Sequence, residues 1–447
     1  MNTTVTYSIY DQLVSDYATR LPQLSANDTA AQQQMREQAF DWFKQKGFPT
    51  IKHEDWKYTS LVPHLKEAFE LPQADAELSS DVAAAAIKSV QIPGLDAYTV
   101  VLLNGKIVPE YSQLPADAKV QVRALAESRE DAVFQQHFGQ YAQSETYHMV
   151  ALNTAFETDG IYIHIAKGAV LDKPLNILHV FNAEKPLLVQ PRHLVVAEER
   201  AEIKILEQYF VPATSATVLT NTVTEVSVAR NAIVHRHVIQ NTTDNARIIT
   251  HTEVAQAGES LYNDFQFSFP GAKLIRNNLN LALNAERTES HFYGLYIAGG
   301  NQLVDNHTMV DHKMPNCFSN EHYKGVMLDN ATAVFNGKIF VRQDAQKTNA
   351  FQKNNNLLLS PKATINSKPQ LEIFADDVKC SHGTTIGQFN KEQLFYLRSR
   401  GIGMEDAKNI LVHAFAGDVS SQISIPAVKE YIDQLTEQSL DAGTVII

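Results

Sequence analysis

Short segments in which apolar residues alternate with other residues follow one another from about residue 160 to 387. This pattern restricts the possible folds of the chain more than any other feature. Clear examples are Ile161-x-Ile163-x-Ile165, Phe265-x-Phe267-x-Phe269 and Leu279-x-Leu281-x-Leu283. A period of two predicts β-strands that each bury one face. No helical pattern of useful length separates the segments, so βαβ units are not expected.

The segments also recur at a regular distance. A small residue followed by a strand returns in steps of about 27–32 residues, which is the period of a repeat architecture. The small residues occur at Gly168-Ala169, Arg200-Ala201, Asn231-Ala232, Gly258, Ala285, Asn330-Ala331 and Lys362-Ala363. We therefore predict a mainly β fold with a parallel β-helix over residues 156–388, in which small residues mark the corners. A sandwich of antiparallel hairpins is the alternative, but Asn-Gly and Asp-Gly turns are largely missing there.

Residues 1–155 are predicted to form a mainly helical N-terminal region that contains one small hairpin. Apolar residues spaced three to four apart predict a helix over residues 30–43, and Gly47 and Pro49 stop it. Asn104-Gly105 between two apolar runs predicts a hairpin over residues 98–108, because Asn-Gly accepts the backbone angles of a type I′ turn. Residues 112–150 return to a polar composition typical of helices.

Residues 389–447 are predicted to form a helical C-terminal region. One helix begins after Asn390, a second covers residues 404–415 with Gly417 after it, and a third begins at Pro426. Such helices after a solenoid are expected to cover the open end of its last coil, and they could also dock a partner.

Composition excludes several classes of protein. The 447 residues include 38 Lys and Arg against 50 Asp and Glu, a net charge of −12, which argues against general binding to nucleic acid or to anionic membranes. Neither a secretory signal nor an apolar run long enough to cross a bilayer occurs, so a cytoplasmic protein is expected. Two cysteines cannot form a disulfide framework. Nucleotide-binding glycine motifs and hydrolase motifs are missing as well.

Histidine and cysteine are the remaining candidates for chemistry. Four histidines and one cysteine fall within 32 residues: His291, His307, His312, His322 and Cys317. Thiolate and imidazole ligands suit zinc, copper and iron–sulfur sites, so a stand-alone metalloenzyme is one hypothesis. The alternative is that these are surface or core residues whose polar atoms are already paired. Because coils stack closely in a β-helix, Cys317 and Cys380 could approach one edge.

Cys380 and His382 form a second candidate site. Residues at positions i and i+2 of an extended segment point to the same face, as two ligands or as a thiolate and its base would. An ordinary structural role is about equally compatible with this spacing. Asp376 and Asp377 precede them, but adjacent strand residues point to opposite faces, so a solvated and a turn-capping role is favoured over joint catalysis.

Several motifs in residues 320–401 resemble a known family. They are Tyr323-Lys-Gly-Val326, Ala333-Val-Phe-Asn-Gly-Lys-Ile339, Ala345-Gln-Lys-Thr348, Asn354-Asn-Asn-Leu-Leu-Leu-Ser360, Lys368 to Gly383 and Leu394-Phe-Tyr-Leu-Arg-Ser-Arg-Gly401. Their pattern is similar to the SufB/SufD family of iron–sulfur cluster assembly subunits, densely over about residues 160–420 and more loosely before. SufB usually carries more cysteines, so the two cysteines here resemble the SufD branch.

The resemblance implies a right-handed parallel β-helix and a non-catalytic scaffold subunit. It implies a heterodimer with SufB through the β-helices, and a SufC ATPase held by the C-terminal helices. The residue matching the family's ligand to a transient iron–sulfur cluster shared with SufB is His382, with Cys380 as the second candidate. No tightly bound cofactor is expected in the isolated chain, in which a homodimer is an option. Thr384 stands where the family more often has alanine.

Overall fold

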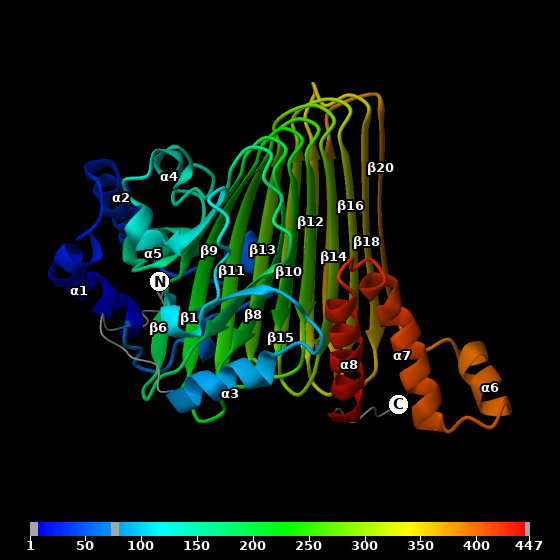
Figure 1. Ribbon diagram of the computed structural model, residues 1–447. Helices are drawn as coiled ribbons and strands as arrows, with labels where there is room; N and C mark the ends of the chain where they lie inside the picture. The colour runs from blue at the N-terminus through cyan, green and yellow to red at the C-terminus, as the bar shows by residue number, and fades with distance from the viewer. Residues whose placement is uncertain (1–7, 73–79, 443–447) are drawn as a thin grey trace.

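A parallel β-helix of about eight turns forms the centre of the protein (Figure 1). The structure is a computed structural model that describes residues 8–72 and 80–442. Most coils contribute one strand to each of two sheets, which face each other across the interior. The prediction of a mainly β fold with stacked parallel coils is therefore confirmed.

Within the described ranges each sheet has ten strands. In spatial order the first sheet contains β2 (Lys106–Ile107), β1 (Tyr98–Leu103), β5 (Leu175–Val180), β8 (Glu202–Phe210), β10 (Ile233–Gln240), β12 (Leu261–Ser268), β14 (Glu289–Ala298), β16 (Phe318–Met327), β18 (Thr348–Leu358) and β20 (Val378–Gly387). The second contains β19 (Thr364–Ile373), β17 (Thr332–Val341), β15 (Leu303–His312), β13 (Leu274–Leu283), β11 (Ala246–Gln256), β9 (Val218–Val228), β7 (Arg192–Ala197), β4 (Gly160–Ile165) and β3 (Val120–Ala124), while β6 (Leu187–Val189) pairs with β9.

The corners of the coils explain the recurring small residues. Arg200 and Asn231 have φ angles of 61° and 57°, in the left-handed region that turns the chain sharply. The alanine after each of them, Ala201 or Ala232, enters the interior and is no more than 1% exposed. A small side chain is needed there because the two sheets converge at the corner.

The interior of the β-helix is partly polar. Arg236 on β10 donates to Glu207 on β8 at 2.7 Å and to Asp264 on β12 at 3.1 Å. All three side chains are buried. Burying these charges is tolerated because each has an opposite charge within hydrogen-bond distance. One guanidinium thus links three consecutive coils.

The N-terminal region packs on the outer face of the second sheet (Figure 1). Its helices are α1 (Ser8–Leu24), α2 (Ala30–Lys46), α4 (Ala132–His137) and α5 (His148–Phe156), while α3 (Ser80–Val90) lies against β5 and β8. The predicted helix at residues 30–43 is confirmed as α2, and Gly47 caps its C-terminus. The predicted hairpin is confirmed as β1 and β2. Residues 1–7 and 73–79 lie outside the described residues.

Residues 112–150 are less helical than expected. They contain β3, an alternating strand that pairs antiparallel with β4, and four short 3₁₀ segments occur in the whole N-terminal part described: Glu54–Trp56, Val62–His64, Pro109–Tyr111 and Leu125–Ser128. The polar composition concealed β3 because only one of its faces, with Val120 and Val122, turns toward the core.

The C-terminal helices are α6 (Lys391–Ser399), α7 (Met404–Ser420) and α8 (Pro426–Ala442). As predicted, the Asn390 side chain caps the first of them. The second continues through Gly417, where a stop was expected. Residues 443–447 lie outside the described part.

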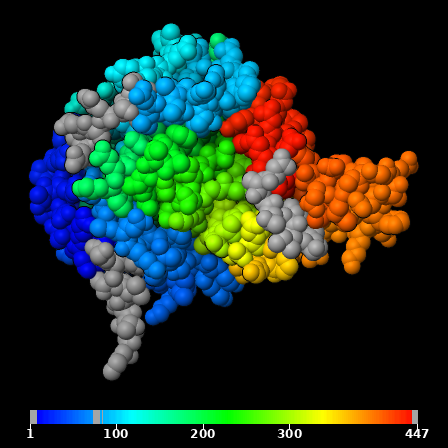
Figure 2. Space-filling model, turned by 90° about the horizontal axis from the view of Figure 1, so that it is seen from below, coloured from blue at the N-terminus to red at the C-terminus, as the bar shows by residue number. Residues whose placement is uncertain are grey.

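The expectation that these helices cover the open end of the last coil is wrong. Val412, Val419, Val428 and Ile432 of α7 and α8 belong to one apolar cluster with outward-facing residues of the first sheet. Those residues are Phe265, Phe267, Leu295, Ile297 and Val326. The strands carry large apolar side chains on both faces, so the outer face needed a cover as much as the interior did. Helix α6 projects away from the body (Figure 2).

Candidate functional site

Cys380 and His382 lie on β20, the last strand of the first sheet. In the parallel ladder Cys380 is opposite Ala350 of β18 and His382 is opposite Gln352. Two positions further along, the hydroxyl groups of Thr384 and Ser367 are 2.9 Å apart across the mouth of the β-helix. Because alternate residues of a strand share a face, Cys380, His382 and Thr384 all turn toward the interior at the open end.

The two candidates differ in exposure. His382 is exposed, whereas Cys380 is half-buried and packs beside Ala345 and Ala350. Burial raises the pKa of the Cys380 thiol above its ordinary value. Since the thiolate is the form that binds metal, iron binding at Cys380 would have to displace a proton.

One thiol and one imidazole cannot complete the coordination of a metal ion or cluster. Further ligands at this site would have to come from another molecule, and the open end leaves room for one. β19 and β20 each form the last strand of a sheet, and β20 is exposed over most of its length. Edge strands of this kind offer unpaired backbone groups to a partner.

The cluster of histidines around Cys317 is dispersed in the structure. His307 faces outward from β15 and its Nε2 lies 2.9 Å from Asp305 Oδ1, while His312 on the same strand is buried and contacts the Ser319 hydroxyl at 2.8 Å. Burial lowers the pKa of His312 to about 4. The remaining two, His291 and His322, face outward from the first sheet.

Cys317 is buried in the main core, where it contacts the Thr288 hydroxyl at 3.0 Å, and Cys380 belongs to a different apolar cluster. Within residues 8–72 and 80–442, no three His, Cys, Asp or Glu side chains are grouped as a metal site requires. The hypothesis of a metal centre at the histidines around Cys317 gains no support from this arrangement.

The carboxylates of Asp376 and Asp377 lie in the exposed turn between β19 and β20. The backbone of Asp377 accepts from Lys347 and donates to the Gln346 side chain at 2.9 Å. Asp377 therefore contributes to the turn through its backbone, and the exposure of both side chains agrees with a solvated role.

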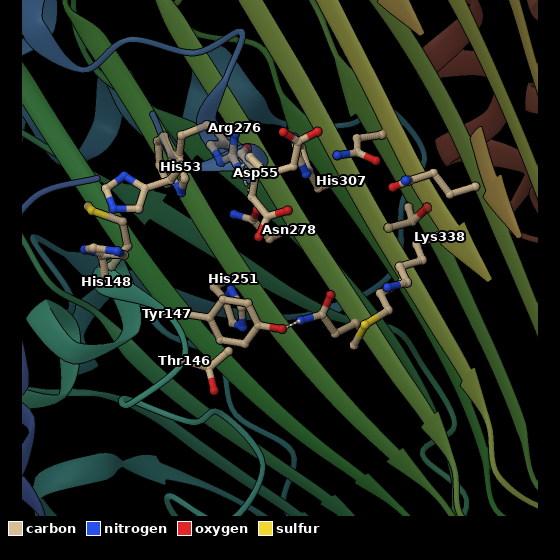
Figure 3. Close-up of a pocket in the computed structure, with 18 residues that line it drawn as sticks. His53, Asp55, Thr146, Tyr147, His148, His251, Arg276, Asn278, His307 and Lys338 are labelled. Carbon is tan, nitrogen blue, oxygen red and sulfur yellow. Dashed lines mark hydrogen bonds between the residues drawn. The ribbon is translucent and has the colours of Figure 1, made fainter. Parts of the chain in front are cut away.

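A cavity of about 350 Å³ on the outer face of the second sheet was not anticipated (Figure 3). It lies between residues 53–56, residues 146–149 and the outward side chains of β11, β13, β15 and β17. The Arg276 guanidinium stacks 3.8 Å from the centre of the Trp56 ring and pairs with Asp305, and His251 Nε2 is 2.8 Å from Glu253.

Arg276 also donates to the backbone carbonyl of Asp55 at 2.8 Å, so its contacts with Asp55 and Trp56 fasten residues 53–56 to the sheet. The only sequence signal for this contact was the aromatic segment Glu54-Asp-Trp-Lys-Tyr-Thr59, which had no period of its own.

None of the helices in the described ranges is long and apolar enough to cross a membrane.

Comparison with known proteins identifies both parts of the chain. Residues 7–177 match the SufBD protein N-terminal region, and residues 179–415 match the SufBD core domain of the SUF system for FeS cluster assembly. A relative from Synechocystis, an iron-sulfur cluster assembly SufBD family protein, is 35% identical over 411 residues, which is 89% of each chain.

Two further relatives extend the comparison. The iron-sulfur cluster assembly protein SufD of Escherichia coli is 30% identical over 405 residues, covering 89% of this chain and 90% of that protein. The chloroplastic protein ABCI7 of Arabidopsis thaliana is 34% identical over 277 residues, covering 60% of this chain and 58% of that protein. The two matched domains cover most of the β-helix and the helical region before it. The chain therefore belongs to the SufBD family and takes part in iron–sulfur cluster assembly.

Proposed function

We propose that this chain is the SufD-type scaffold subunit of a SufBCD complex and performs no catalysis itself. It pairs with SufB through the open end of the β-helix and holds SufC through its C-terminal helices. A transient iron–sulfur cluster assembles at the SufB interface with His382 and Cys380 as ligands from this chain. The complex works in the cytoplasm, and the three regions divide at about residues 155 and 388.

The open end of the β-helix carries the proposal. Among the residues that the structure describes, it is the place where two candidate metal ligands, an exposed His382 and a half-buried Cys380, point inward on an unpaired sheet edge. A second β-helix placed against this edge would continue the ladder and enclose the site. Two ligands from this chain are too few for a cluster, so the remaining ligands come from the partner.

The helix α6 supports the docking of an ATPase. It has no buried residue, and its Phe395 and Tyr396 are 74% and 56% exposed. Met404 and Ile410 of α7 are also exposed. An apolar surface on a projecting helix is typical of a protein interface.

The first experiment replaces the proposed imidazole ligand. His382→Ala should leave folding and co-purification with SufB and SufC intact, since the side chain is exposed, but should abolish cluster maturation in cells. His291→Ala, which alters an outward-facing histidine of β14, is the control and should mature clusters normally. Normal maturation with His382→Ala would refute the ligand assignment.

The second experiment tests the C-terminal surface. Deleting everything after residue 390 would uncover the apolar outer face of the first sheet, so point substitutions are the sharper test. Phe395→Glu combined with Tyr396→Glu should prevent co-purification with SufC while pairing with SufB survives. Tyr58→Glu, at an aromatic residue 42% exposed elsewhere, is the control. Retained SufC in the double variant would show that α6 is not the docking element.

A further inference from the structure

A line of side chains runs through the interior to His382. The ladder of the first sheet places Glu321 of β16 opposite Gln352 of β18, and Gln352 opposite His382 of β20. All three turn inward at the same level of the β-helix. Glu321 and Gln352 are fully buried, at 0% and 1% exposure, whereas His382 is accessible because no coil follows it.

The amide of Gln352 is held in one orientation. Its Nε2 donates to Glu321 Oε1 at 3.2 Å, and the Thr308 hydroxyl of the opposite sheet donates to the other oxygen of Glu321. Gly337 faces Gln352 from β17, and a Cβ at that position would lie only 2.3 Å from Gln352 Nε2. The Gln352 amide can therefore occupy this position because residue 337 has no side chain.

This orientation leaves an acceptor unused. Gln352 Oε1 is buried and has no hydrogen-bond partner among the residues that the structure describes. Burying an unpaired carbonyl oxygen costs roughly 1–3 kcal/mol, so such atoms usually have a partner in the working state. The next inward side chain on the ladder is His382, about 5 Å away between strand backbones.

We infer that Gln352 positions His382 by accepting a hydrogen bond from one imidazole nitrogen, so that the other nitrogen presents its lone pair to iron. A histidine that binds metal usually donates its second N–H to such an acceptor, which fixes both its tautomer and its ring orientation. Glu321 and Thr308 contribute indirectly, because they hold the Gln352 amide in this orientation. This inference rests on the proposed ligand role of His382.

The test uses the complex with SufB and SufC, loaded anaerobically with iron and sulfide. Gln352→Met keeps the length of the side chain but removes the acceptor. It should preserve complex formation and thermal unfolding, slow cluster loading about 10- to 100-fold, and change the nitrogen hyperfine coupling of the reduced cluster.

Gln266→Met is the matched control, because Gln266 is also an inward, buried glutamine of the first sheet but lies on β12. Its loading rate and nitrogen coupling should equal those of the unaltered complex.

A second variant tests the same contact in case Gln352→Met does not fold. Gly337→Ala keeps the Gln352 side chain but displaces its amide. The nitrogen coupling should therefore change in the same direction as in Gln352→Met, by a smaller amount. Unaltered loading and coupling in both variants, with the coupling lost in His382→Ala, would overturn the role of Gln352 alone. Nitrogen coupling that persists in His382→Ala would overturn the ligand assignment itself, and the inference with it.

Discussion

The two ends of the β-helix are built differently. At the N-terminal end the first sheet finishes with the hairpin of β1 and β2, the second finishes with the antiparallel strand β3, and side chains such as Leu102 and Val122 fill the interior. At the C-terminal end β19 and β20 stop with their inward residues uncovered. A solenoid needs caps to avoid uncontrolled association, so an end left uncapped by the described residues is consistent with the partner surface proposed above.

The buried carboxyl groups of the interior also differ between the two ends. Near the closed end, Glu207 is buried beside Arg236, whose charge holds the pKa of this carboxyl far below its ordinary value. Near the open end, Glu321 is equally buried but has only neutral partners, and desolvation raises its pKa to about 7. The same residue type is thus a stabilising ion pair in one half and a costly buried acid in the other.

Glu207→Gln should have the largest effect on stability. It leaves the buried Arg236 with Asp264 as its remaining carboxylate, and breaking a buried pair costs about 3–5 kcal/mol. Glu202→Gln, at a partly exposed position of the same strand, should change the free energy of unfolding by less than about 0.5 kcal/mol in urea titrations.

The pH dependence of the free energy of unfolding is a second test of the same ion pair. Because the folded pKa of Glu207 lies below its unfolded value, its contribution is present above about pH 4.5 and is lost as the pH falls. Equal stabilities of Glu207→Gln and the unaltered chain at pH 7 would show that the ion pair contributes nothing there.

A matched pair of truncations compares the ends directly. Leu102→Ala at the closed end removes a fully buried side chain and should lower the free energy of unfolding by about 2–5 kcal/mol. Ile386→Ala on β20 should cost less than about 0.5 kcal/mol in the isolated chain, because that side chain is 51% exposed. Similar losses at both positions would mean that the C-terminal end is covered in solution.

Glu321→Gln should have a smaller effect than Glu207→Gln and the opposite sign. Between about pH 4.5 and 7 the folded chain keeps a proton that the unfolded chain releases, so the unaltered protein loses stability as the pH rises through this window. Glutamine at this position titrates no proton. The variant should match the unaltered chain at pH 4 and be more stable by roughly 1–3 kcal/mol at pH 8. Thermal unfolding at the two pH values measures the difference, and parallel pH profiles would contradict it.

Local periodicity predicted the coils well because each coil repeats the same requirement: alternating side chains and a small corner residue. The shared face of Cys380 and His382 followed from the same period. The position of α7 and α8 could not be predicted from this period. Alternation indicates one buried face for each strand, and Phe265 and Phe267 lie on such a face, but the opposite face of their strand is buried as well. Contacts between distant segments, such as Trp56 on Arg276, leave no local pattern at all.

Arg236 affects how whole coils of the β-helix could be gained or lost. In a modular array a repeat can be gained or lost whole, because each unit contacts only its neighbours. Here one guanidinium is shared between the coil before it and the coil after it. Removing its own coil would leave two buried carboxyl groups without this partner, and removing either neighbour would take away one of its two carboxyl partners. Loss of a coil within residues 207–264 is therefore expected to cost more stability than loss of a coil without such a shared charge, and these three coils are expected to unfold together.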